Sequence, residues 1–201
     1  MPEDGTGPGG TTLRFRAATP DDVEGLVALV HAAYRGEPTA ATWTTETHLL
    51  GGQRADAEMV RAAVSDPDST VLVATDDSDP DASPAIVACC EVSAPDPDGT
   101  SVLGMFAVDP ERQGGGLGRQ VLAAGEDTAT GLGATTLELH VIDVRVELID
   151  WYRRRGYIVT DERHPFPYGD ERFGLPRRDD LQFAVLRKEL AAGKKDRAPE
   201  L

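Results

Sequence analysis

The feature that most limits how this chain folds is a glycine-rich turn between an apolar run and a helical pattern. The run over residues 102–108 is typical of a strand, and the turn after it has four glycines within five positions: Gly114, Gly115, Gly116 and Gly118. The next residues repeat at the spacing of one helix face: Leu117, Val121, Leu122, Gly125 and Ala129. Glycines let backbone N–H groups converge, and a helix N-terminus adds partial positive charge. The segment therefore predicts an anion cradle whose natural guest is a pyrophosphate.

Two nucleotide-binding motifs fail at this turn. A Walker A loop needs Lys and then Ser or Thr after its last glycine, but Arg119 and Gln120 follow Gly118. The dinucleotide fingerprint needs a third glycine, and Val121 or Arg119 stands at that position, depending on which glycines begin the motif. The glycines alone leave two interpretations open, a ligand cradle or a flexible turn before a helix.

The rest of the chain alternates between strand-like runs and helical stripes. A strand over 13–17 precedes a helix that Thr19 caps, with Pro20 in its first turn and Asp22 where a capping box takes an acid. Residues 35–54 have no clean period, which favours a long loop or a broken helix. Further strands are predicted over 70–75, 85–92, 102–108, 135–142, 157–159 and 181–186, and further helices around 59–64, from 117 onward and over about 145–155. This order predicts an α+β or mixed α/β fold.

The chain is predicted to form one domain. At 201 residues it is long enough to bury a stable core without disulfides or structural metals. No linker-like stretch or internal repeat divides it. Polar, disordered tails are expected at 1–11 and 192–201, around a folded part over 12–191. Cys89 and Cys90 are adjacent within an apolar run, a poor arrangement for a disulfide. Buried reduced thiols and a cytoplasmic location are therefore expected.

Charge and hydropathy argue against several partners. The formal net charge of −15 disfavours nucleic acid, because phosphate binding needs clustered Lys and Arg. The same charge would attract a cationic amine, although its main effect is to keep the surface soluble. No run of about eighteen apolar residues occurs, so no membrane partner is expected. The first ten residues lack the basic and apolar regions of a secretory signal.

Two blocks of this sequence resemble the GNAT superfamily of N-acetyltransferases. In the turn, Gln113, Gly116 and Gly118 match the coenzyme A signature Gln/Arg-x-x-Gly-x-Gly/Ala, which follows a strand. Residues 148–157 resemble the family's Ala-Ile-x-Leu-Tyr-x-Lys-x-Gly-Phe, and the two blocks have the family's order and spacing. The resemblance covers residues 13–190. It implies the GNAT fold, a central mixed, mostly antiparallel sheet of about seven strands flanked by about four helices.

The resemblance implies acetyl-CoA as the cosubstrate and no metal. In this family the strand before the turn splays from the next strand, and the pantetheine arm lies in the gap. The arm would then meet the backbone of Phe106, Ala107 and Val108. The pyrophosphate would meet the turn and the helix start: Gln113, Gly114, Gly115, Gly116, Leu117, Gly118 and Arg119. Arg145 stands where the family often has a cofactor-binding Asn, and it is expected to reach a phosphate, to bind an acidic substrate group, or to pair with Glu147 or Asp143.

The resemblance also implies direct attack of an amine on the thioester, without a covalent enzyme intermediate. Tyr152 matches the tyrosine that protonates the departing thiolate, although a core tyrosine on this helix face would have the same spacing. The general base has three candidates. Glu91 ends an apolar strand, and Glu138 and His140 lie on the polar face of theirs, where side chains that are merely solvated are also expected.

Residues for the acceptor are expected in the family's two specificity loops. The candidates there are Tyr34, Trp43, Glu46, His48 and Phe173, which suit a small-molecule pocket or serve to close the core.

Together these observations predict an enzyme that moves an acetyl group to the primary amine of a small molecule or peptide. The alternative is a non-catalytic acetyl-CoA-binding module, which would keep the glycine turn without needing Tyr152. An antibiotic amine, a polyamine, an amino acid and a protein N-terminus all stay open as acceptors. Homodimers are common in the family, so a homodimer is one oligomeric state to test.

Overall fold

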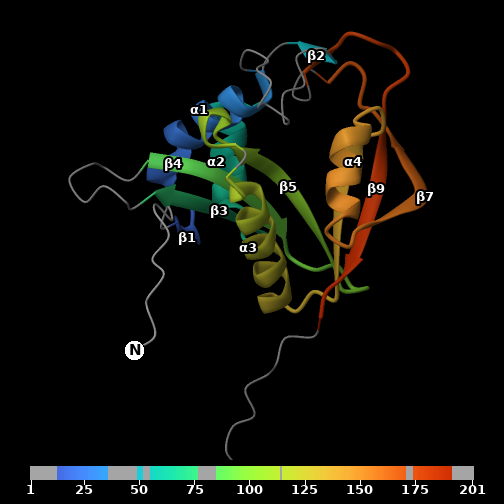
Figure 1. Cartoon of the computed structure of the whole chain (residues 1–201). Helices are drawn as coiled ribbons and strands as arrows, with labels where there is room; N and C mark the ends of the chain where they lie inside the picture. Colours follow the sequence, from blue (N-terminus) through green and yellow to red (C-terminus); the bar gives the residue numbers. More distant parts are fainter. Residues whose placement is uncertain are drawn as a thin grey trace, which may run out of the picture.

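The computed structural model describes residues 13–35, 49–51, 55–76, 85–113, 115–170 and 174–191. Its main element is a seven-stranded sheet in the order β1-β3-β4-β5-β6-β9-β7 (Figure 1). The strands are β1 (Leu13–Ala17), β3 (Ser69–Asp76), β4 (Ala85–Ser93), β5 (Thr100–Val108), β6 (Thr136–Ile142), β7 (Ile158–Pro165) and β9 (Gln182–Glu189). Neighbouring strands are antiparallel except β5 and β6, which are parallel. The predicted mixed, mostly antiparallel sheet is confirmed.

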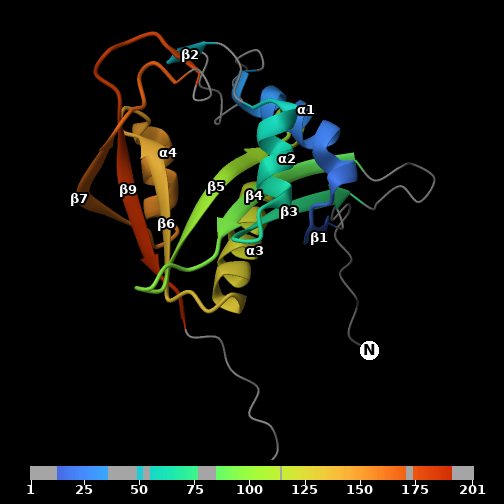
Figure 2. The same ribbon diagram turned by 180° about the vertical axis from the view of Figure 1, so that it is seen from behind.

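Four α-helices cover the sheet within the described ranges. They are α1 (Val23–Arg35), α2 (Ala57–Ser65), α3 (Leu117–Gly131) and α4 (Val146–Arg153). Figures 1 and 2 show α1 and α2 on one face of the sheet and α3 and α4 on the other. A separate apolar core fills each side, with Val30 and Val60 under the first pair of helices and Val121, Leu137 and Tyr152 under the second. None of the helices in these ranges has the length and hydropathy needed to cross a bilayer.

The start of α1 shows how local sequence signals work here. Thr19 and Asp22 form the predicted capping box, in which the Thr19 backbone N–H donates to Asp22 Oδ2 at 2.7 Å. The guanidinium of Arg16 in β1 donates two further bonds to the same carboxylate, at 2.7 and 2.8 Å. A short 3-10 turn (Pro20–Asp22) results, and it joins β1 to α1 across one corner of the sheet.

Four elements differ from the sequence-based expectation. The last helix is shorter, since α4 ends at Arg153. The strand expected over 157–159 runs to Pro165 as β7; it lies at the sheet edge and is mostly exposed, so its polar second half has no apolar period to detect. A small sheet of β2 (Leu50–Gly51) and β8 (Leu175–Pro176) was not predicted, because two-residue strands show no period.

Candidate active site

β5 and β6 share a ladder only where the two strands begin. Residues 100–102 pair with residues 136–138, after which β5 continues to Val108 and β6 to Ile142. Figure 2 shows the two strands separating toward their carboxyl ends. Two separating parallel strands present backbone N–H and C=O groups toward the space between them, and an extended ligand can bind such groups as an added strand would. This opening is the centre of the candidate site.

A bulge in β5 shapes one wall of the opening. The register with β4 moves from Cys89 opposite Ala107 to Glu91 opposite Gly104, so β5 has one extra residue in between. Within it Met105 has a φ of 43°, the only positive value at a non-glycine residue in the described chain. Backbone strain of this kind costs energy and is concentrated at functional sites. The bulge therefore makes this part of β5 a candidate functional segment.

Two side chains hold the carbonyl groups of the bulge. The thiol of Cys89 donates to the Met105 carbonyl at 3.3 Å, and the hydroxyl of Tyr34 donates to the Phe106 carbonyl at 2.6 Å. The side chains then alternate between the two faces: Phe106 and Val108 join the core under α3 and α4, and Ala107 joins the core under α1 and α2. The three residues predicted to meet the pantetheine arm thus border the opening, and their binding role stays a prediction.

The predicted anion cradle lies just beyond the end of β5. The side-chain amide of Gln113 donates to the Val108 carbonyl at 3.2 Å and so ties the turn to the strand. Gly116, with φ of 84°, is the N-cap of α3 and supplies no side chain to the first helical N–H groups. A Cβ added at Gly115 would meet nothing within 4 Å, so space lies above the turn. Leu117 is buried and anchors the helix start. Gly114 lies outside the described residues.

A cluster of arginines adds positive charge beside this turn. The guanidinium of Arg155 stacks on the Trp151 ring at 3.6 Å, and its Nη1 donates to the Trp151 carbonyl at 2.6 Å. Its Nε is buried without a hydrogen-bond partner. Burial lowers the pKa of Arg155, and the positive charges of Arg154 and Arg119 lower it further. Arg119 lies in the first turn of α3, directly after the glycines of the cradle. Positive charges held close together favour the binding of an anion nearby.

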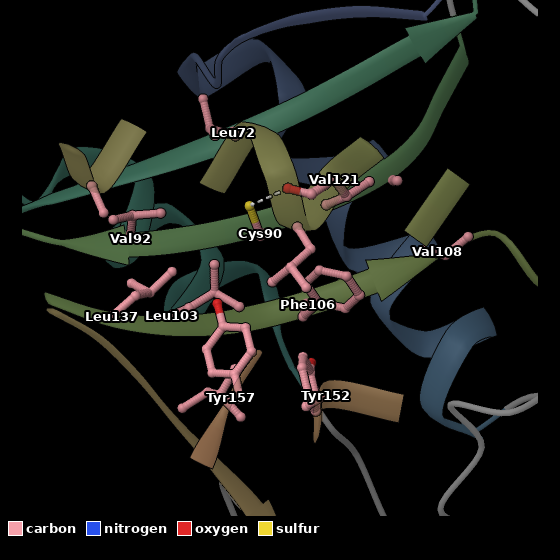
Figure 3. Close-up of a cluster of buried hydrophobic side chains, with 14 of the residues drawn as sticks. Leu72, Cys90, Val92, Leu103, Phe106, Val108, Val121, Leu137, Tyr152 and Tyr157 are labelled. Atoms are coloured by element: carbon pink, nitrogen blue, oxygen red, sulfur yellow. Dashed lines mark hydrogen bonds between the residues drawn. The ribbon is translucent and has the colours of Figure 1, made fainter. Parts of the chain in front are cut away.

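Tyr152 faces the opening from α4. Its side chain is 4% exposed and packs edge-on against Phe106, Trp151 and Tyr157, at centroid distances of 6.3, 4.9 and 5.6 Å. Figure 3 shows the ring of Tyr152 near the rings of Phe106 and Tyr157, its two labelled partners. Burial raises the pKa of Tyr152 well above its usual range, so the phenol stays protonated at neutral pH. Within the described chain, its hydroxyl has no hydrogen-bond partner.

Comparison with known proteins identifies the family. The model of the acetyltransferase (GNAT) family matches residues 28–157, which include both the cradle and Tyr152. The chain belongs to the acetyltransferase (GNAT) family. No curated protein sequence matches it at a significant level.

Solved structures share the GNAT fold with this chain. Nourseothricin acetyltransferase is 22% identical with a TM-score of 0.61. The match covers 89% of the present chain and 99% of the nourseothricin acetyltransferase chain. The structure of yncA from Salmonella typhimurium, with its cofactor acetyl-CoA, is 19% identical with a TM-score of 0.62. The match covers 94% of the present chain and 98% of the yncA chain. PaiA N-acetyltransferase from Thermoplasma acidophilum, in complex with coenzyme A, is 17% identical with a TM-score of 0.59. The match covers 89% of the present chain and 99% of the PaiA chain. The predicted GNAT fold is confirmed, and the protein is an acetyltransferase.

Arg145 departs from the GNAT pattern and is buried. Its side chain is 2% exposed at the N-cap of α4, and its Nε donates to Glu147 Oε1 at 2.7 Å. The pairing with Glu147 is therefore the one of its predicted roles that the contacts bear out. Arg145 and Tyr152 are seven residues apart, two helical turns, so they lie on one face of α4.

Two of the three candidate bases form one ion-paired network on the α1/α2 side of the sheet. Glu138 Oε1 bonds to His140 Nε2 at 2.7 Å, and Oε2 accepts from Arg187 Nε at 2.6 Å. Glu138 is 8% exposed, so the expectation of a solvated polar face is wrong for this residue: β9 brings Arg187 opposite it. Burial raises its pKa, but the hydrogen bonds from His140 and Arg187 outweigh burial and lower it. The catalytic role of either residue stays a prediction.

The third candidate base, Glu91, lies on the same side of the sheet in β4. Burial raises the pKa of its carboxyl, which a hydrogen bond from Ser69 partly offsets. A carboxyl with a raised pKa accepts a proton more readily at neutral pH than Glu138 does.

Only one of the predicted acceptor residues lies in the described chain. Tyr34 contacts the β5 bulge, whereas Trp43, Glu46, His48 and Phe173 fall outside the described residues. Sequence reasoning missed Arg155 as a candidate residue. The run of three arginines before Gly156 was its only signal, because its neighbour Arg119 is 36 residues away.

Proposed function

We propose that this protein transfers the acetyl group of acetyl-CoA to the primary amine of a small molecule or peptide, by direct attack within a ternary complex. The observation that carries the proposal is that three features meet at one opening. These are the separating strands β5 and β6, the uncapped N-terminus of α3, and the buried phenol of Tyr152. A long thioester with a polyanionic end would use all three.

The residues around the cradle fit the anionic end of acetyl-CoA. The protein has a formal net charge of −15, which would repel a polyanion unless local cations offset it. Arg119 and Arg155 supply such cations beside the helix N-terminus, and the unpartnered Nε of Arg155 is a donor for a phosphate oxygen. The open space above Gly115 leaves room for the pyrophosphate.

Tyr152 supports the proposed chemistry as a hydrogen-bond donor to the leaving sulfur. Its raised pKa lies above the roughly 8.5 of an ordinary thiol, so full proton transfer to a free thiolate would be uphill. A hydrogen bond that strengthens as the C–S bond breaks avoids this cost. The positive charge of Arg145 partly offsets the effect of burial and eases any charge that develops on the phenol oxygen.

A non-catalytic acetyl-CoA-binding module is the second candidate function. It would use the same opening and the same cradle. The position of Tyr152 against Phe106 of β5 favours the enzyme, because a binding module has no use for a hydrogen-bond donor beside the departing sulfur.

The deciding experiment measures free thiol while acetyl-CoA is incubated with the protein and a panel of primary amines. Direct transfer predicts initial-velocity lines that intersect when both substrates are varied. Calorimetric binding of coenzyme A without thiol release for any amine would favour the binding module. Parallel lines together with a trapped acetylated enzyme would refute direct transfer.

A further inference from the structure

A cavity of about 230 Å³ lies between α1, α2 and the β4–β5 pair, on the side of the sheet opposite Tyr152. Two of its lining residues, Tyr34 and Glu91, carry polar side-chain groups, and the others are apolar: Val30, Ala55, Met59, Val60, Ala63 and Met105. Pockets for drug-sized ligands have volumes of roughly 300–1,000 Å³. This cavity therefore suits a small molecule or a single side group.

Glu91 is the unusual member of this lining. It lies mid-sheet between Val71 of β3 and Gly104 of β5, next to the core under α1 and α2. No lysine, arginine or histidine of the described chain pairs with it, and the nearby charge of Asp66 is also negative. A carboxyl without a cation in apolar surroundings is costly, and such groups mark sites where a ligand supplies the missing charge.

Gly104 connects this carboxyl with the opening between β5 and β6. A Cβ added at Gly104 would lie 3.7 Å from Glu91 Oε2, so the carboxyl reaches over a residue that has no side chain. Gly104 follows the last paired residues of the β5–β6 ladder by two positions and precedes the bulge at Met105. Met105 itself lines the cavity. The cavity and the opening thus share the same short stretch of β5.

We propose that this cavity is the acceptor site, that it takes a small apolar primary amine without a carboxylate, and that Glu91 accepts the proton of the amine. This inference rests on the proposed acetyl transfer and names its substrate class. The alkyl part of the amine lies among the apolar side chains, and its ammonium group is the cation that Glu91 lacks.

The ammonium gives one proton to the Glu91 carboxylate, and the free nitrogen forms a bond to the thioester carbon while the carbonyl electron pair moves to oxygen. As that pair returns, the C–S bond breaks and its electrons leave on sulfur, which accepts a hydrogen bond from the Tyr152 hydroxyl. The second nitrogen proton reaches the sulfur through this hydroxyl, which gives its own proton only as it takes up the new one, and Glu91 releases its proton to water. The products are an amide and the free thiol.

The first test compares amines as acceptors under saturating acetyl-CoA. Across straight-chain amines from ethylamine to hexylamine, kcat/KM should rise by about fourfold per methylene until the cavity is full, as burial of a methylene predicts. A chain carrying a carboxylate, 6-aminohexanoate, should be at least tenfold poorer than hexylamine, because its charge would be buried without a partner. Equal kcat/KM for hexylamine and 6-aminohexanoate would overturn the substrate class.

The second test uses variants of the cavity and matched controls. Ala63→Leu should lower kcat/KM for hexylamine at least tenfold by filling the cavity, while Ala62→Leu, on the exposed side of α2, should not. Glu91→Gln should lower kcat/KM at least a hundredfold without lowering thermal stability, since it removes an unpaired charge. Gly104→Ala should lower kcat, because its methyl group would lie 3.7 Å from Glu91 Oε2 and crowd the carboxyl.

Binding measurements separate this inference from the acetyl transfer itself. Hexylammonium should shift backbone amide NMR signals of α2 and β4 in the wild type and not in Ala63→Leu or Glu91→Gln. Coenzyme A affinity, measured by calorimetry, should be equal in all these proteins. If Glu91→Gln and Ala63→Leu acetylate hexylamine like the wild type, the acceptor site is elsewhere although transfer stands. If no amine releases thiol, the proposed function fails, and absence of the hexylammonium shifts in the wild type would then overturn the site as well.

Discussion

The hydroxyl of Tyr34, at the end of α1, donates a 2.6 Å hydrogen bond to the carbonyl oxygen of Phe106 in β5. The two residues are 72 positions apart in the sequence. Through this bond the helix that lines the cavity holds the bulge that borders the opening between β5 and β6. The geometry of the thioester site therefore depends on a contact from the opposite face of the sheet.

Replacing Tyr34 by Phe should loosen the bulge while keeping the ring's packing. We expect a loss of about 1–2 kcal/mol in the free energy of unfolding, because a carbonyl group loses its donor. We also expect kcat to fall at least threefold with coenzyme A affinity little changed. Chemical denaturation and steady-state kinetics measure the two effects. Tyr168→Phe is the control, since the Tyr168 hydroxyl also bonds to the backbone, at the Leu181 N–H, but does not contact the bulge. Equal kinetic losses in both variants would contradict a specific role for Tyr34.

A carboxylate at Gly115 should weaken coenzyme A binding. Gly115→Asp meets no steric obstacle and places negative charge above the cradle, where Coulomb repulsion near a protein surface predicts a loss of about 10–100-fold in affinity. Isothermal calorimetry measures the change. Gly115→Asn controls for size, and Gly131→Asp, at the other end of α3 with equally open space, controls for charge. Unchanged affinity in Gly115→Asp with an intact fold would move the pyrophosphate elsewhere.

Arg155 should bind a phosphate group of coenzyme A. Arg155→Met keeps an apolar side chain against Trp151 and removes the charge, so we expect about tenfold weaker binding and a shallower dependence of the affinity on salt. Arg153→Met is the matched control, because Arg153 is exposed and pairs with Asp150. Binding titrations at several salt concentrations give both quantities. If the two variants lose affinity equally, the effect is one of net charge and not of a site.

Tyr152→Phe separates catalysis from packing. A hydrogen-bond donor to the charge that develops in the transition state contributes about 10²–10³-fold, so kcat should drop at least tenfold under conditions where chemistry limits the rate. The free energy of unfolding should change by less than the about 1 kcal/mol of a typical hydrogen bond, since the hydroxyl has no partner in the described chain.

Tyr157→Phe is the control from the same aromatic cluster, because the Tyr157 hydroxyl donates to Glu126 at 3.1 Å. It should lose stability and keep kcat. Wild-type kcat in Tyr152→Phe would assign Tyr152 to the core.

Asp22 should make the start of α1 sensitive to acid. Its bonds with Arg16 and Thr19 lower its pKa from 3.8 to about 2. Because the folded pKa is depressed, the stabilisation is complete above about pH 4 and is lost as the pH falls toward 2. Asp22→Asn should therefore cost about 0.5–2 kcal/mol at pH 7, and the difference from the wild type should shrink between pH 4 and 2. Urea unfolding at several pH values measures this, and a difference that stays constant down to pH 2 would contradict the assignment.

Local signals in the sequence identified much of this fold. The capping box of Thr19 and Asp22 formed as predicted, and the five residues predicted to face inward on α3 are all buried. The glycine turn leads into α3 as predicted, and Tyr152 packs against Phe106 of β5, while their binding and catalytic roles stay predictions. These features depend on residues within one strand, one turn or two turns of helix, so a linear pattern is enough to specify them.

Contacts between distant segments were decided by the tertiary structure alone. Arg187 meets Glu138 across 49 positions and removes it from solvent, and the cavity around Glu91 exists only because α1 and α2 pack over β4 and β5. The bulge at Met105 depends on the register with β4, which no local period reports. The sequence by itself thus determined most of the elements and the family, and it predicted the cradle. Sheet register and helix packing decided which charges find partners, because those energies depend on groups that come together only in the folded chain.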